Sequence, residues 1–141
     1  MALRTMEGRA RRRIDAPAER CREAVADLES WPGWLSGIES VSGPPDHALV
    51  KARMVGFPLV LAVALEVEAG GVTLRRLPFE AGDPERFELQ LALSDESTQA
   101  CQASVELSAR VDLPRLLPLP PGIADRVAGR VLSDLDSRVS A

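Results

Sequence analysis

Residues 101–111 alternate between apolar and polar side chains without a break, which is the most constraining pattern in the chain. Successive side chains of a β-strand point to opposite faces of a sheet, so this alternation predicts a strand with one buried face. Looser alternation predicts further strands at residues 3–14, 38–42, 49–55, 59–68, 72–77 and 87–93. Short turns separate the strands after residue 38, among them the pair Gly70-Gly71, so we expect an antiparallel meander.

A long helix is predicted after the last strand. Between residues 121 and 139, apolar side chains recur at helical spacing, at Ile123, Val127, Val131 and Leu135. Residues 17–28 show the same spacing, and a second short helix is expected from near Pro32 to Gly37. Each strand needs cover on one face and the long helix needs a sheet, so the predicted fold is α+β: a curved antiparallel sheet of about seven strands around the C-terminal helix, closed at one end by two short helices.

Bulk properties limit the possible partners. The 141 residues suit a single domain, residues 1–141, and the net charge of −4 argues against a broad nucleic-acid interface. The apolar run at residues 59–65 is far too short for a bilayer, so we expect no stable membrane insertion and a cytoplasmic location. Cys21 and Cys101 are expected to be buried free thiols. The oligomeric state is left open.

Two stretches resemble a known superfamily. Ile14-Asp15-Ala16-Pro17 is followed by Asp27 and then by Trp31-Pro32-Gly33-Trp34. With the proline-bearing bend before the last helix, this pattern resembles the START/Bet v 1-like superfamily, also called SRPBCC. Within it, the chain looks most like the bacterial polyketide cyclase/dehydrase and coenzyme-Q-binding-like group. The resemblance implies a helix-grip fold with a cavity between sheet and helix, and a lipid, sterol, quinone or polyketide as ligand.

The inner face of the expected sheet is mostly aliphatic. This favours binding of a hydrophobic small molecule over catalysis of a reaction. The residues predicted to line its cavity are Trp34, Leu35, Ile38, Met54, Leu61, Val63, Leu74, Arg76, Phe87, Leu89, Leu91, Ala103, Val105, Leu107, Ile123, Val127 and Val131. Burying a ligand against such walls gains about 25 cal/mol per Å² of apolar area.

Two other functions remain open at this stage. A cyclase/dehydrase-type enzyme needs polar groups converging on the cavity, and the candidates are Arg12, Arg53, Arg76 and Glu66. A buried arginine among them would need an anionic partner, which a ligand carboxylate or phosphate could supply. A protein-interaction module would use the apolar, proline-rich segment of residues 113–122.

No metal or cofactor is expected. His47 is the only histidine, lies in a turn and has no second histidine or nearby cysteine, so zinc is not indicated. No glycine-rich loop joins a strand to a helix, so nucleotide binding is not indicated either.

Overall fold

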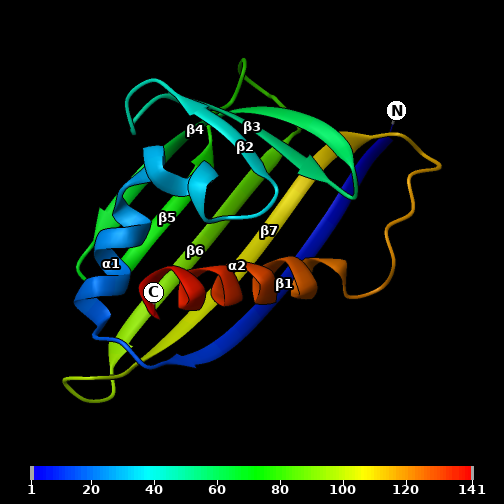
Figure 1. Ribbon diagram of the computed structural model, residues 1–141. Helices are drawn as coiled ribbons and strands as arrows, with labels where there is room; N and C mark the ends of the chain where they lie inside the picture. The colour runs from blue at the N-terminus through cyan, green and yellow to red at the C-terminus, as the bar shows by residue number, and fades with distance from the viewer. Residues whose placement is uncertain (1, 141) are drawn as a thin grey trace.

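The computed structural model describes residues 2–140, which form seven strands, two α-helices and one 3-10 helix (Figure 1). In chain order the elements are β1 (Ala2–Ile14), α1 (Ala18–Ala26), η1 (Leu28–Gly33), β2 (Ile38–Ser42), β3 (Ala48–Met54), β4 (Phe57–Glu68), β5 (Gly71–Arg76), β6 (Arg86–Asp95), β7 (Cys101–Leu113) and α2 (Ile123–Ser140). Met1 and Ala141 lie outside the described residues, and the domain limits 1–141 stay a prediction.

The strands form one antiparallel sheet in the order β1-β7-β6-β5-β4-β3-β2. The predicted meander is confirmed, since β2 to β7 are neighbours in sequence order. β1 instead crosses the molecule to pair with β7 along its whole length, from Ala2 opposite Leu113 to Ile14 opposite Cys101. The first and last strands are therefore adjacent, and β1 and β2 are the two edges of the sheet.

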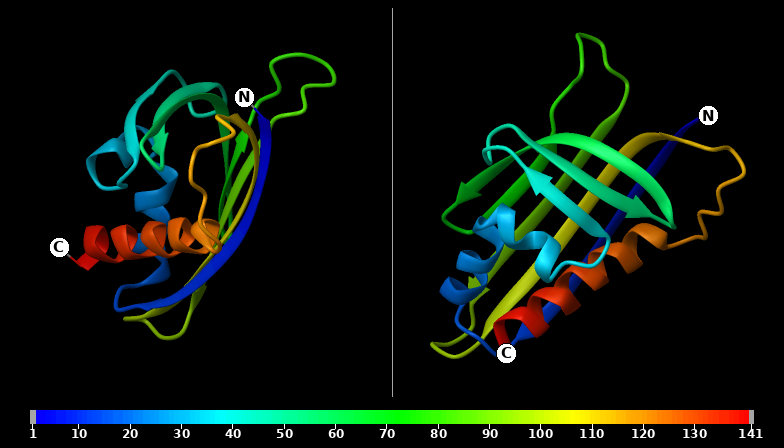
Figure 2. Two further views of the ribbon diagram at one scale, coloured as in Figure 1. Left: turned by 90° about the vertical axis from the view of Figure 1, so that its right-hand side faces the viewer. Right: turned by 45° about the horizontal axis from the view of Figure 1, so that its top comes forward.

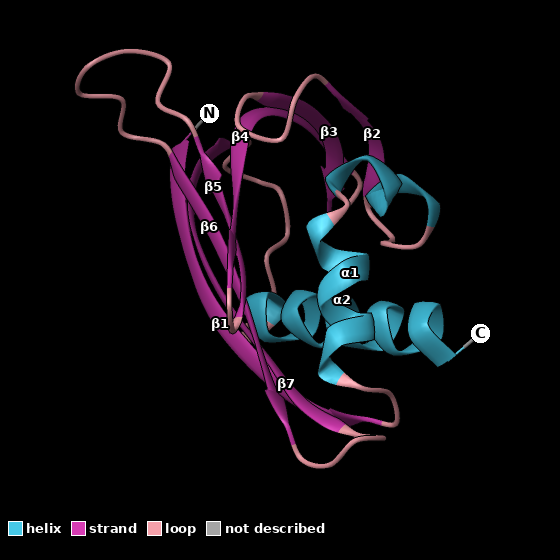
Figure 3. Cartoon of the chain, turned by 90° about the vertical axis from the view of Figure 1, so that its left-hand side faces the viewer, coloured by secondary structure: helices cyan, strands magenta, loops and turns pink. Residues whose placement is uncertain are grey.

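The sheet is strongly curved, and the helices lie on its concave side (Figure 2). α2 packs against β1 and β7, while α1 packs against α2, β5 and β6. η1 packs against β2, on the part of the fold that curls over the concave side (Figure 3). The predicted α+β architecture, a curved antiparallel sheet around a C-terminal helix, is confirmed.

The two ends of α2 are fixed by polar contacts. Asp125, in its first turn, accepts a hydrogen bond of 2.8 Å from the backbone N–H of Arg9 on the edge strand β1. At the other end, the Val139 carbonyl accepts one of 3.1 Å from the Arg20 guanidinium of α1. Between them runs a buried apolar stripe made up of Ala124, Ala128, Val131, Leu132, Leu135 and Val139.

One element differs from its prediction. The second short helix, expected from near Pro32 to Gly37, is a 3-10 helix over Leu28–Gly33. The prediction used proline as a helix start, but the Ser30 N–H already bonds the Asp27 carbonyl at 3.0 Å, so the turn begins before the proline. A 3-10 helix this short tolerates the missing N–H of Pro32, which a longer helix would not.

Candidate functional site

The concave face of the sheet carries a continuous aliphatic surface. One row across three strands consists of Leu74, Leu89 and Leu107, which lie directly opposite one another. The next row holds Val72, Leu91 and Val105 in the same way. Cross-strand neighbours share a face, so the register shows that these side chains form one wall. The exposed fraction of each is 5 % or less.

Most of the predicted lining residues belong to this wall or to its border. Those on the strands, buried on the concave face, are Met54, Leu61, Val63, Leu74, Leu89, Leu91, Ala103, Val105 and Leu107. Phe87 is half-buried on the same face. Around the connection from η1 to β2, Leu35 is buried, and Trp34 and Ile38 are half-buried.

The α2 residues of the predicted set lie to one side of the helix's buried stripe. Val131 is buried, whereas Ile123 and Val127 are half-buried. The deepest positions of the helix are Ala128, Leu132 and Leu135, which the predicted set leaves out. It also omits Val50, Leu65, Val72 and Leu93, although their alternation in the sequence places them on the concave face.

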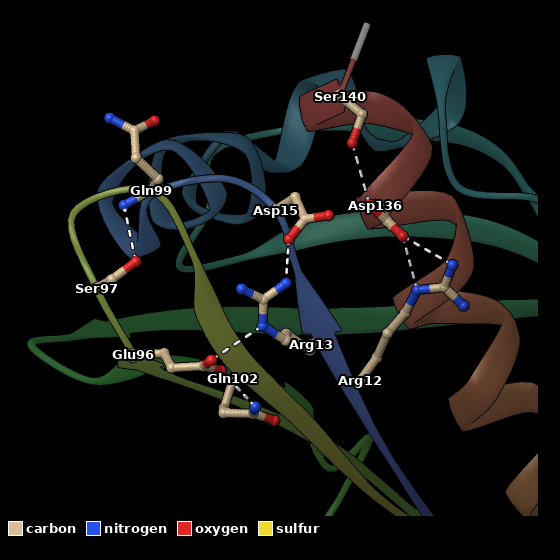
Figure 4. A network of polar contacts seen from close by, with 9 residues as sticks. All are labelled: Arg12, Arg13, Asp15, Glu96, Ser97, Gln99, Gln102, Asp136 and Ser140. Atoms are coloured by element: carbon tan, nitrogen blue, oxygen red, sulfur yellow. Dashed lines mark hydrogen bonds and ion pairs between the residues drawn. The ribbon is translucent and has the colours of Figure 1, made fainter.

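The polar residues considered for catalysis do not converge on this wall. Arg53 forms an ion pair with Glu39, and Glu66 forms one with Arg75 at 2.7 Å; all four side chains are at least 46 % exposed. Both Arg53 and Glu66 lie on the convex face, since the register places them in line with other outward-facing residues. Arg12 reaches across to α2 and pairs with Asp136 at 2.7 Å (Figure 4).

Arg76, one of the residues predicted to line the cavity, is nearly enclosed, but its partners belong to the protein. Its guanidinium contacts Asp83 at 2.8 Å and Glu85 at 3.2 Å, both in the loop between β5 and β6. The exposed fraction is 10 % for the Arg76 side chain and 7 % for that of Asp83. Hydrogen bonds from the Phe79 and Glu85 amides, and then from Arg76, lower the pKa of Asp83 to about 2. The ion pairs of Arg76 with Asp83 and Glu85 thus hold the loop between β5 and β6 in place.

Comparison with known proteins rests on structure. No family model matches the chain, and no curated protein matches its sequence. A START superfamily protein from Mycobacterium smegmatis superimposes with a TM-score of 0.74 at 20% identity, covering 95% of this chain and 97% of that one. The Zhui aromatase/cyclase from Streptomyces sp. R1128 gives a TM-score of 0.69 at 13% identity, covering 97% and 94%. A major latex-like protein from Panax ginseng gives 0.70 at 8% identity, covering 97% and 99%.

The chain has the START/Bet v 1-like fold. Nearly full-length coverage in both directions means that the sheet, the short helices and α2 all have counterparts. The resemblance noted at the opening residues is therefore confirmed at the level of the fold. Identities of 8–20% show the fold alone and assign no ligand or reaction to this chain.

In this structure the concave side chains and the buried face of α2 belong to one packed apolar cluster. A surface hollow of about 800 Å³ lies mainly on the convex face at one end of the sheet, beside Arg75, Arg86 and Arg110, and Arg76 and Phe87 also border it. Another, of about 480 Å³, is bordered by Glu7, Glu88, Glu106 and Asp125. These hollows are lined mainly by charged and polar side chains, so an apolar ligand would find little to bury against there.

The remaining residues discussed from the sequence are structural or exposed. Cys21 and Cys101 are fully buried free thiols with their sulfurs 3.7 Å apart, and burial raises the pKa of Cys21 to about 12. His47 is exposed in its turn. Within residues 2–140, no three His, Cys, Asp or Glu side chains are grouped as metal ligands. No helix of that range is long and apolar enough to cross a bilayer.

Proposed function

We propose that this protein binds an uncharged hydrophobic small molecule, a lipid, quinone or polyketide-like compound, between the concave face and α2. The observation that carries the proposal is the aliphatic wall itself, which extends across β5, β6 and β7 and has the paired Arg76 at its border. Thr73 is the one buried polar residue within residues 2–140, and it faces the convex side with its cross-strand partners Glu66 and Gln90. The predicted lining set is the proposed site.

The character of the wall limits the ligand to an uncharged one. An ionised group moved from water into an apolar space without a partner costs far more than the burial of a few methylenes returns. Arg76, the one charged member of the predicted set, is already paired with Asp83 and Glu85. A fatty carboxylate or phosphate would therefore have to keep its charged end outside.

The two rival functions have weaker support. A cyclase-type reaction would need acid or base groups in contact with the ligand, yet Arg12, Arg53 and Glu66 are exposed and paired with other side chains. An interaction module would need an apolar patch on residues 113–122. Leu116 is 96% exposed there, but Leu117 and Leu119 pack against the core, which leaves a single exposed leucine.

The proposal is tested by the uptake of Nile red, an uncharged dye that fluoresces in apolar surroundings. Leu61→Trp enlarges a side chain that is 8% exposed on the concave face, and Val60→Trp does the same to its neighbour, which is 59% exposed on the convex face. We expect the wild type and Val60→Trp to bind the dye with equal affinity and Leu61→Trp to bind at least tenfold more weakly. Equal binding by all three proteins, each checked by its melting temperature, would place the dye elsewhere and reject the proposed site.

A further inference from the structure

A polar contact joins α2 to the connection between η1 and β2. Ser36, in that connection, donates two hydrogen bonds to the same carboxylate oxygen of Asp134, one from its backbone N–H at 2.9 Å and one from its hydroxyl at 2.8 Å. Arg130, one turn earlier on α2, lies 3.1 Å from the Ser36 hydroxyl and 3.5 Å from Asp134. Two segments 98 residues apart are thereby held together.

The contact lies at the border of the proposed site. Leu35, next to Ser36, is 5% exposed and belongs to the same buried cluster as Val131 on α2. In Figure 3, η1 and the β2–β3 hairpin lie above α2, and α1 crosses in front of α2. The polar contact therefore lies beside a buried residue of the apolar core cluster.

The connection is fixed on both sides of Ser36, so a movement there is confined to a few residues. Before it, the Trp31 indole is buried and donates to the Val25 carbonyl at 3.2 Å. After it, the Gly37 carbonyl accepts a bond of 2.8 Å from the Arg53 N–H, and Gly37 adopts a φ of +89°, which favours glycine. A segment anchored at both ends, with a glycine in it, can open without unfolding the sheet.

We propose that Ser36 and Asp134 form a latch that controls the passage of ligand to the concave face. The proposal rests on the proposed function, because a latch matters only if a ligand enters. Hydrogen bonds to a carboxylate are stronger than those between neutral groups. The Asp134 side chain is 17% exposed, whereas Ser36 is an exposed residue. Arg130 is 68% exposed and supports the pair from the solvent side.

The test compares two aspartates of the same helix. Asp134→Ala removes the latch, whereas Asp136→Ala removes a carboxylate two residues further on that pairs with Arg12 of β1. We expect Asp134→Ala, which removes both hydrogen bonds from Ser36, to raise the association and dissociation rates of Nile red in stopped-flow fluorescence by at least about tenfold. The equilibrium affinity should change little, because the latch is closed with and without ligand. Asp136→Ala should leave both rates unchanged.

A milder variant covers the case in which Asp134→Ala folds poorly. Ser36→Ala removes the hydroxyl but keeps the amide bond to Asp134, so it should raise both rates by a smaller factor. Dye uptake at the same rate in the wild type, Asp134→Ala and Ser36→Ala would overturn the latch and leave the proposed function standing. Failure of the wild type to take up the dye at all would reject the proposed function, and the latch with it.

Discussion

Gly8 of β1 lies directly beneath Ala124, at the start of α2. A Cβ placed on Gly8 would come 2.3 Å from the Ala124 carbonyl carbon and 2.4 Å from the Asp125 nitrogen, closer than any real contact. The close packing of β1 against the start of α2 is therefore possible only because Gly8 has no side chain. Arg9, the next residue, donates its backbone N–H to the side-chain carboxylate of Asp125, which holds the start of the helix beside the strand.

Gly8→Ala should accordingly be among the more destabilising single changes in the chain. The obstructing atoms are backbone, so the helix start has to shift, and overpacking of this kind costs about 1–3 kcal/mol. Urea denaturation measures the loss. Gly33→Ala is the control, since a Cβ there meets nothing within 4 Å, and equal effects of the two changes would contradict the close approach.

The turn between β3 and β4 contains a correctable strain. Val55 has a φ of +50° and Gly56 a φ of +79°, the pair of signs that a two-residue type I′ hairpin requires. A β-branched residue is disfavoured in that conformation, whereas asparagine tolerates it. Val55→Asn should raise the free energy of unfolding by about 1 kcal/mol.

The control for this change is Val60→Asn, in the exposed middle of β4. Val60 lies in extended backbone and has no strain to relieve, so asparagine there should lower stability through its poor strand propensity. A stabilisation at both sites, or at neither, would argue against strain at Val55. Thermal and urea unfolding of the three proteins decide the point.

Acid should weaken the loop between β5 and β6 in a defined pH range. The pKa of Asp83 is about 2 in the folded protein, against about 3.9 in an unfolded chain, so its charge stabilises the fold above the higher value. That contribution is lost as the pH falls through the lower one. The stability advantage of the wild type over Asp83→Asn should be constant above about pH 5 and shrink towards pH 2. A difference that stays constant down to pH 2 would contradict the depressed pKa.

The buried thiols should resist chemical modification in the folded state. Burial raises the pKa of Cys21 to about 12 and also that of Cys101, so little reactive thiolate exists near neutral pH. At pH 8, a thiol reagent such as DTNB should react with both cysteines only at the rate at which the protein unfolds. The labelling rate should therefore rise steeply with urea. Rapid labelling of either thiol in buffer would show that α1 and β7 separate readily.

The strands and the long helix were predictable because their patterns are periodic and local. The alternation at residues 101–111 coincides with β7, and the spacing of Ile123, Val127 and Val131 coincides with α2. Glu66, one of the polar candidates taken from the sequence, lies on the outer, solvent-exposed face of the sheet and pairs with Arg75. The extent of the short 3-10 helix was missed, because six residues carry too little periodicity to compete with the signal of Pro32.

Features that depend on contacts between distant segments could not be predicted. Arg76 was predicted to line the cavity, but its partners Asp83 and Glu85 lie in an irregular loop whose path no periodicity describes. The bond between Ser36 and Asp134 depends on how far the sheet curls, which is set by the whole fold. The lining on α2 was shifted to one flank, towards Ile123 and Val127, because a wide apolar stripe does not reveal its own centre.

Native mass spectrometry of the protein purified from the cells that normally make it, followed by organic extraction, tests the central claim most directly. A ligand held on the aliphatic wall should appear as one molecule of fixed mass per chain, uncharged and soluble in organic solvent. The same preparation of Leu61→Trp should lack it, while Val60→Trp should retain it. Wild-type protein that carries only the mass of its own chain, and yields nothing on extraction, would contradict the account of a ligand enclosed between sheet and helix.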